Sequence, residues 1–106
     1  MSEVTLIAFL KRREGMSPQE FQAYWSQVHA PLVLGTASGH HALHYERRAV
    51  VMGGYDGVTI QTFASRDAFE ESIREPDYQL IAEDLPKFLD VDAIQFVITE
   101  EPVVHK

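Results

Sequence analysis

Cysteine is missing from this chain of 106 residues. Its absence excludes disulfide bonds, thiolate nucleophiles, iron–sulfur clusters and zinc sites built on sulfur. Chains without disulfides are typical of reducing compartments, so we expect a cytoplasmic protein.

Long apolar runs and clustered positive charge are missing as well. No apolar stretch approaches the roughly 20 residues that span a bilayer, and the first ten residues lack the basic start of a secretory signal. Nine Lys and Arg are scattered among 16 Asp and Glu, which gives a formal net charge of -7. No basic stripe is available to neutralise a phosphate backbone. We therefore expect neither membrane insertion nor nucleic-acid binding.

The chain does have enough apolar material for one core. Hydrophobic residues make up 45% of it, and its length is typical of a single domain, residues 1–106. Strands are predicted over residues 4–10, 44–52, 58–63 and 93–99, because these runs are β-branched or alternate with period two.

The first helix has the clearest start in the sequence. Ser17 stands at its N-cap, Pro18 at the first helical position, and Glu20 completes a capping box. We expect the helix to end near Ala30, because Pro31 disfavours helical geometry in the residue before it.

The rest of the helical pattern is less regular. Residues 35–39 contain two glycines and predict a flexible connection. Ser65 then caps a short helix, and Pro76 restarts a second helical segment that Pro86 limits.

The order strand, helix, strand, strand, helix, strand predicts an α+β domain. It is the split βαβ arrangement of ferredoxin-like folds, with an antiparallel four-stranded sheet. Helices then cover only one face of the sheet. To the other face we assign Thr5, Ile7, Phe9, Gln61, Phe63, Gln95 and Val97.

That face is too apolar for water and too polar for a dry core. We therefore predict a homodimer in which two sheets pack face to face and enclose a ligand cavity. The alternative is a monomer on which Gln61 and Gln95 simply face solvent.

Residues 6–33 read LIAFLKRREGMSPQEFQAYWSQVHAPLV. A strand ends in Lys and Arg, a Ser-Pro-capped helix carries Trp25, and the motif His-Ala-Pro-Leu begins at His29. This pattern resembles the EthD family, and the resemblance continues to the last strand. It implies a dimeric α+β barrel. Relatives include cofactor-free polyketide cyclases, decarboxylases and dehydratases, methylmuconolactone isomerases, and an accessory protein of ether degradation.

His29 is the first candidate for catalysis. It lies in the last turn of the predicted helix, where we expect little burial, and imidazole titrates near neutrality. From its position alone, capping the helix C-terminus is the more ordinary role. The match to the family motif favours a general acid or base instead.

Tyr45 is the second catalytic candidate. In the lactone isomerases that the sequence resembles, a tyrosine before Glu and Arg lies in the pocket. A phenol can donate to a carbonyl or enolate oxygen, although ordinary strand packing explains Tyr45 equally well. As substrate-binding residues we predict Trp25, Phe9, Phe63, Gln61, Gln95, Arg47, His44 and His41.

A metal site is the next alternative, since His40, His41 and His44 lie close together in sequence. They lack the HExxH frame and have only Glu46 nearby as a further ligand, so we predict no metal. The glycines between the strands precede no helix, so no nucleotide or other cofactor is predicted either.

Together these features predict a cofactor-independent lyase or isomerase. Its substrate would be a small, hydrophobic, oxygenated molecule such as a polyketide or a lactone, with His29 moving a proton and Tyr45 holding an oxyanion. The lack of cysteine excludes the thiol-dependent variant of this chemistry. Two alternatives stay open: a cofactor-free monooxygenase of the dimeric barrel superfamily, and a binding or accessory protein without turnover.

Overall fold

A computed structural model describes residues 2–106 of the chain. The elements in order are β1 (Val4–Leu10), α1 (Pro18–Tyr24), the π-helical turn η1 (Trp25–His29), α2 (Ala30–Leu34), α3 (Ala37–His40), β2 (Ala42–Ala49), β3 (Gly57–Phe63), α4 (Arg66–Arg74), α5 (Tyr78–Asp84), the 3₁₀ turns η2 (Leu85–Lys87) and η3 (Val91–Ala93), and β4 (Gln95–Thr99).

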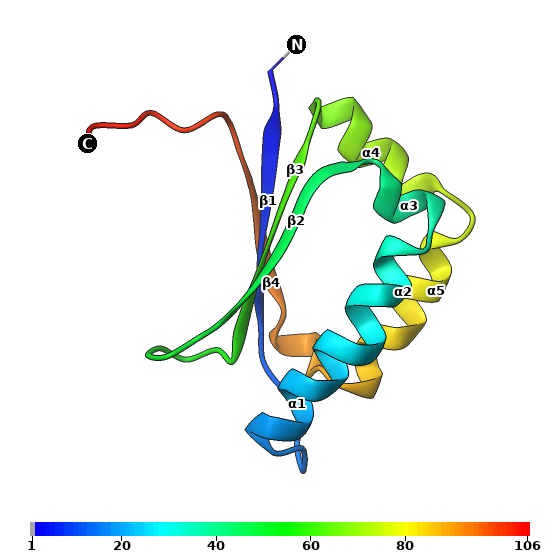
Figure 1. The fold of residues 1–106 in the computed structure, drawn as a ribbon, viewed down its shortest axis with the longest axis vertical. Coiled ribbons are helices and arrows are strands. Elements are labelled where there is room, and N and C mark those ends of the chain that lie inside the picture. Colours follow the sequence, from blue (N-terminus) through cyan, green and yellow to red (C-terminus); the bar gives the residue numbers. More distant parts are fainter. Residues whose placement is uncertain (1) are drawn as a thin grey trace.

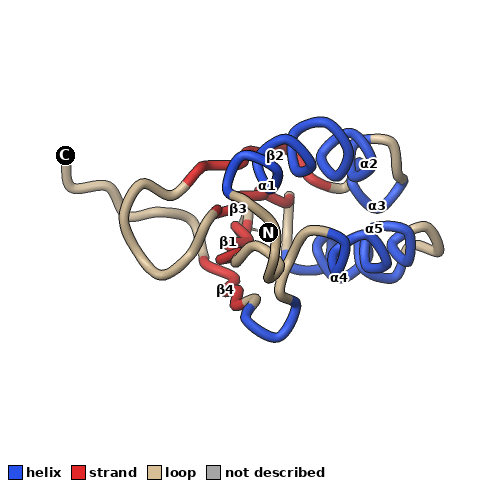
Figure 2. The backbone as a smooth tube through the Cα atoms, turned by 90° about the horizontal axis from the view of Figure 1, so that it is seen from below, coloured by secondary structure: helices blue, strands red, loops and turns tan. Residues whose placement is uncertain are grey.

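The strands form one antiparallel sheet in the order β2-β3-β1-β4. Figure 1 shows the helices packed on one face of this sheet, and Figure 2 shows them as two layers beside it, with α1 to α3 above α4 and α5. The predicted α+β, ferredoxin-like fold with a four-stranded antiparallel sheet is confirmed. The other face of the sheet is uncovered in the single chain.

The strand register decides which side chains face the helices. Leu6 pairs with Gln61, and both line the space beneath the helices, whereas Ile7 pairs with Ile60 on the uncovered face. The prediction that Gln61 and Phe63 lie on the uncovered face is therefore wrong. Successive residues of a strand alternate in direction, so an assignment of β3 relative to β1 that slips by one residue moves every side chain to the wrong face.

The first helix begins as predicted but does not end near Ala30. Ser17 forms the capping box. Beyond the π turn, the helical path continues through α2 to Leu34. The N–H of Ala30 bonds to the carbonyl of Trp25, five residues back. Pro31 therefore falls in the first turn of a new helical segment, where its missing N–H costs nothing.

The segment expected to be a flexible connection is ordered and partly buried. Thr36 caps α3, and the Asp77 carboxylate accepts hydrogen bonds from the N–H groups of Ala37 and Ser38. Gly39 is buried, and a Cβ there would lie 1.9 Å from the Val33 carbonyl oxygen. Glycine thus serves close packing at this position rather than mobility.

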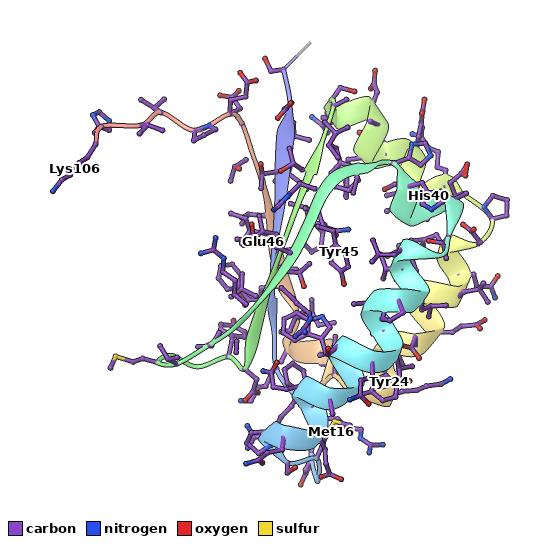
Figure 3. The ribbon with its side chains drawn as sticks, viewed as in Figure 1. Met16, Tyr24, His40, Tyr45, Glu46 and Lys106 are labelled. Carbon is purple, nitrogen blue, oxygen red and sulfur yellow. The ribbon has the colours of Figure 1, made fainter. Side chains whose placement is uncertain are left out.

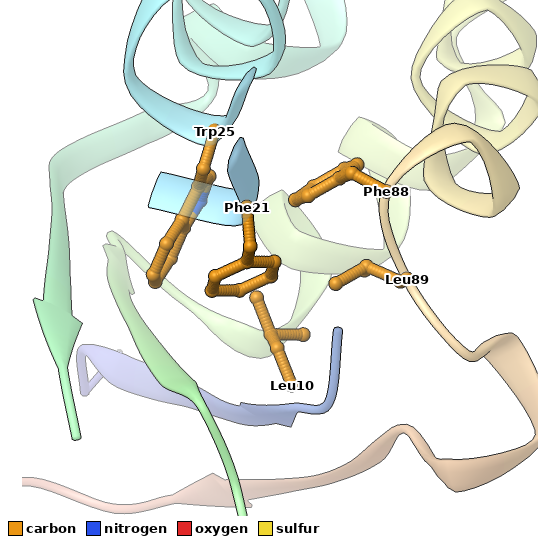
Figure 4. Packing of buried hydrophobic residues seen from close by; sticks show 5 residues of the cluster. All are labelled: Leu10, Phe21, Trp25, Phe88 and Leu89. Carbon is orange, nitrogen blue, oxygen red and sulfur yellow. The ribbon is translucent and has the colours of Figure 1, made fainter. Parts of the chain in front are cut away.

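The core lies where α1 and the π turn pack against the end of β1 and the segment that follows η2 (Figure 4). Its buried residues are Leu10, Phe21, Trp25, Phe88 and Leu89. A Cβ at Gly57 would lie 2.3 Å from the Trp25 ring. The missing side chain of Gly57 therefore lets the indole lie directly on β3.

Candidate active site

A cavity of about 400 Å³ lies between the sheet and the helices. Leu6, Ala8 and Phe96 belong to its sheet wall, and Val33 and Ile81 to its helical wall. Most of the lining is apolar, as in small-molecule sites generally. The cavity is lined by residues of a single chain. The predicted cavity between two facing sheets needs a second copy and stays a prediction.

His29 occupies the end of the π turn and lines this cavity. The residue is only 6% exposed, which corrects the expectation of little burial. Its Nδ1 lies 2.8 Å from Oδ2 of Asp84, and its ring packs against Phe88 with centroids 4.8 Å apart. Because Nδ1 is engaged by the carboxylate, Nε2 is the nitrogen available to a molecule in the cavity.

Asp84 ends α5 and is itself 5% exposed. Its Oδ1 accepts a hydrogen bond of 2.6 Å from the Tyr24 hydroxyl, and the Lys87 ammonium lies 3.9 Å away. Tyr24 and His29 are five residues apart, and in a regular α-helix they would point about 140° away from each other. The wider π turn reduces that angle, so both side chains reach one carboxylate.

The electrostatics of this group favour a neutral imidazole. Burial lowers the pKa of His29, and the hydrogen bond and charge of Asp84 oppose this effect only partly. Burial and the neighbouring Asp84 raise the pKa of Tyr24 to about 12, so Tyr24 remains a donor. With Asp84 as acceptor at Nδ1, we assign the proton of neutral His29 to Nδ1 and the lone pair to Nε2.

Tyr45 reaches the same cavity from β2. Figure 3 shows Tyr45 and the next residue, Glu46, on opposite sides of the sheet. Burial raises the pKa of the Tyr45 phenol, and the indole of Trp25 beside it acts in the opposite direction. The phenol therefore stays protonated at neutral pH and can donate a hydrogen bond. Trp25 Nε1 is buried and has no hydrogen-bond partner among the residues that the structure describes.

Residues 13–92 match the EthD domain family. This chain belongs to the EthD family. None of the curated protein sequences matches it. An EthD family protein of Bacillus halodurans C-125 superposes with a TM-score of 0.76 at 18% identity, over 94% of this chain and 99% of that one. The resemblance seen in the sequence is thereby confirmed.

Two further solved structures share the fold of this EthD domain. SnoaB from Streptomyces nogalater, described as a cofactor-independent oxygenase, has a TM-score of 0.71 at 14% identity and covers 98% of this chain and 97% of its own. A dimeric ferredoxin-like protein of unknown function from Thermobifida fusca has a TM-score of 0.71 at 14% identity and covers 94% and 92%. At these identities the likeness shows the fold alone.

The EthD domain brings several predicted binding residues together. Trp25, Gln61 and Phe63 line the cavity with His29. The guanidinium of Arg47 lies 5.6 Å from the centre of the Trp25 ring, where a cation is attracted to the aromatic face. Arg47 therefore lies behind the indole rather than in the cavity lining.

Four other predicted binding residues do not line the cavity. Phe9 and Gln95 pair with each other on the uncovered face, where Phe9 packs against Tyr55. His44 points to that face too and contacts Glu46 at 2.7 Å. Successive residues of a strand point to opposite faces, and all three residues alternate with neighbours that line the cavity.

His41, the fourth, follows α3 and lies 3.9 Å from the Glu75 carboxylate, outside the cavity lining.

Tyr24 and Asp84 are missed by the sequence analysis. Asp84 lies 55 residues from His29 along the chain, so no local spacing connects them. One signal was available. Asp84 follows Ile81 by three residues and so falls on the buried stripe of α5, where an unpaired carboxylate would be costly.

Residues 2–106 lack two features, a metal-binding group and a membrane-spanning helix. In this part of the chain no group of three His, Asp or Glu side chains is placed to hold a metal ion. Within the same range no helix is both long and apolar enough to cross a membrane.

Proposed function

We propose that this EthD domain is a cofactor-independent lyase or isomerase in which His29 is the general acid or base. The observation that carries the proposal is the buried imidazole, whose Nδ1 is fixed 2.8 Å from Asp84 while its ring lines an apolar cavity. A base oriented by a carboxylate and opening onto a ligand site is the arrangement that proton transfer requires.

The proposed reaction begins with a proton on carbon next to a carbonyl group. Neutral His29 takes that proton at Nε2, and the electron pair of the broken C–H bond moves onto the carbonyl oxygen to form an enolate. Asp84 stabilises the imidazolium, and Tyr45 donates a hydrogen bond to the enolate oxygen. In an isomerisation, the His29 imidazolium returns the proton to a different atom of the substrate. In a dehydration, it protonates a hydroxyl group of the substrate, which leaves as water as the enolate electrons form the new double bond.

The cavity fits a small hydrophobic substrate. Its volume of about 400 Å³ lies in the range of small-molecule sites, and its walls are mainly aliphatic and aromatic. A polyketide or a lactone combines such an apolar body with the carbonyl group that the reaction needs.

An oxygenase is the second candidate. The observation that favours it is the shared fold with SnoaB, which is described as a cofactor-independent oxygenase. The same base could deprotonate an electron-rich phenol, whose anion would then react with dioxygen. Consumption of oxygen with an anthrone or a quinol separates this activity from that of a lyase. A binding protein without turnover would bind such compounds and leave them unchanged.

The test is a screen of lactones, anthrones and polyketide mimics, followed by His29→Gln. Glutamine keeps an amide donor for Asp84 but cannot exchange a proton near pH 7. We expect kcat to fall about 10²- to 10⁴-fold with the circular dichroism spectrum unchanged.

His105→Gln, in the exposed C-terminal segment, is the matched control and should retain full activity. Wild-type turnover by the His29 variant would show that His29 is not the proton-transfer group.

A further inference from the structure

A buried donor without a partner lies in the wall of the cavity. Trp25 is 0% exposed, and none of residues 2–106 accepts a hydrogen bond from its Nε1. Buried polar groups are nearly always paired, so an exception at a cavity calls for an explanation. The benzo edge of the indole packs on Gly57. Its N–H lies close enough to the Tyr45 hydroxyl to lower the pKa of that phenol, but the geometry of the pair does not make a hydrogen bond.

Other polar side chains also line the cavity, among them Ser38, Ser72, Thr59, Gln61 and Tyr78. At the α3–α4 end, Ser38 Oγ donates to the carbonyl of Ser72, and Ser72 Oγ donates to the carbonyl of Phe69, both at 2.6 Å. These hydroxyl protons are already used. Trp25 Nε1 is the buried donor that stays unpaired among the described residues, and the Tyr45 hydroxyl lies near it in the same wall.

We propose that Trp25 Nε1–H and Tyr45 Oη–H together bind one acceptor oxygen of the ligand, and that this oxygen is the carbonyl of an enolisable aryl ketone. The apolar body of the ketone fills the cavity toward α4 and α5. The inference rests on the proposed function, because this is the oxygen on which negative charge develops when His29 removes a proton. Two neighbouring donors form an oxyanion site, and the Arg47 cation behind the indole adds to its positive potential.

The single tryptophan of the chain permits a direct test. In ¹⁵N-labelled protein the indole N–H gives one cross-peak, which we would follow during titration with 1-tetralone and with tetralin, its analogue without the carbonyl oxygen. We expect a downfield shift of the indole proton with 1-tetralone and no such shift with tetralin. A loss of one hydrogen bond in Tyr45→Phe should weaken 1-tetralone binding about 3- to 10-fold.

Tyr55→Phe makes the same chemical change on the uncovered face and should leave the affinity unaltered. Equal indole shifts with both compounds, no shift with 1-tetralone up to its solubility limit, or an unaltered affinity in Tyr45→Phe would each overturn the inference. The His29→Gln variant separates it from the proposed function. That variant should still show the indole shift, even though its turnover is lost.

Discussion

At the scale of the residue, His29 is governed by two opposing effects. Burial removes water from the imidazolium and lowers its pKa, while the Asp84 carboxylate favours the charged form and raises it. Because burial is the larger effect, the ring is neutral near pH 7 and can accept a proton. Once protonated, it has a carboxylate at 2.8 Å in a poorly solvated site, which lowers the cost of the intermediate.

The first prediction concerns Asp84→Asn. This change removes the two contributions that raise the pKa of His29 and leaves burial unopposed. We expect the imidazole pKa, already below 6.5, to fall further in an NMR titration. In kcat/KM, which should rise with pH as His29 loses its proton, the acidic limb should move to lower pH. Because asparagine no longer fixes the tautomer, kcat should fall at least about 10-fold.

Asp67→Asn is the matched control, since Asp67 is exposed in the first turn of α4. It should leave the His29 titration unchanged. An unchanged or raised imidazole pKa in Asp84→Asn would contradict the role assigned to the carboxylate.

The sequence predicts some residues of the site and not others for a physical reason. Trp25 and His29 lie four residues apart on one helical path, so local spacing is enough to place them together. Asp84 comes from a different helix 55 residues away, and only tertiary packing brings it to His29. The position of this carboxylate on the buried side of α5 predicts that a polar or charged group pairs with it. It does not predict that the group is His29.

At the scale of the element, the π turn is the feature that the sequence predicts least well. The rule that a helix ends before proline rests on the steric clash of the proline ring with the preceding residue and on the missing N–H. The clash is a tendency only, and Ala30 keeps α-helical backbone angles before Pro31. The bond from Ala30 to the carbonyl of Trp25 spans five residues, and a new helical segment then begins with Pro31 near its start. The same turn points Tyr24 and His29 toward Asp84. A π turn is often found at functional sites, and here it positions the candidate base.

The faces of β3 illustrate a second limit. The alternation of Ile60 with Thr59 and Gln61 correctly indicates a strand with two different faces. It does not tell which face meets the helices. The uncovered face also carries a row of apolar side chains, which in a sequence looks like the face that packs against the helices. Such a row is expected on an outer face only where another surface covers it.

The second prediction tests the contact between β3 and the π turn. In Gly57→Ala the added Cβ would lie 2.3 Å from the Trp25 ring, which is fully buried and cannot move freely. We expect the free energy of unfolding in urea to fall by about 1–3 kcal/mol, as for overpacked cores.

Gly54→Ala, in the β2–β3 hairpin, provides the comparison. No atom lies within 4 Å of a Cβ at that position, so stability should change by less than about 1 kcal/mol. Equal effects of the two substitutions would mean that the indole does not depend on close contact with Gly57.

At the scale of the whole molecule, the sheet has one face packed under helices and one face open. Ile7 lies at the centre of an apolar row on the open face, between Ile60 and Val97. The β2–β3 hairpin and the C-terminal segment both extend to the side away from the helices (Figure 1). Their exposed apolar residues are Val51, Met52, Val103 and Val104.

These features favour the predicted homodimer. Because the cavity is lined by the helices and the helix-facing side of the sheet, dimerisation through the open face should leave these walls unchanged. Dimer formation and ligand binding can therefore be separated experimentally.

The last prediction makes that separation with Ile7→Glu. A carboxylate at the centre of the apolar row would be buried without a partner in a dimer but would stay hydrated in a monomer. We expect the wild-type chain to sediment as a dimer at micromolar concentration in analytical ultracentrifugation. Ile7→Glu should weaken association at least about 100-fold, since an uncompensated buried charge costs about 3 kcal/mol or more. The imidazole titration of His29 should be retained.

Leu80→Glu introduces the same charge on the exposed side of α5, where Leu80 is 51% exposed, and should leave the dimer intact. A wild-type monomer, or an Ile7→Glu dimer as stable as the wild type, would show that the open face is not the dimer interface. Loss of the His29 titration in a folded Ile7→Glu monomer would show instead that the cavity depends on the second copy. The cavity walls, all drawn from one chain, lead us to expect the opposite.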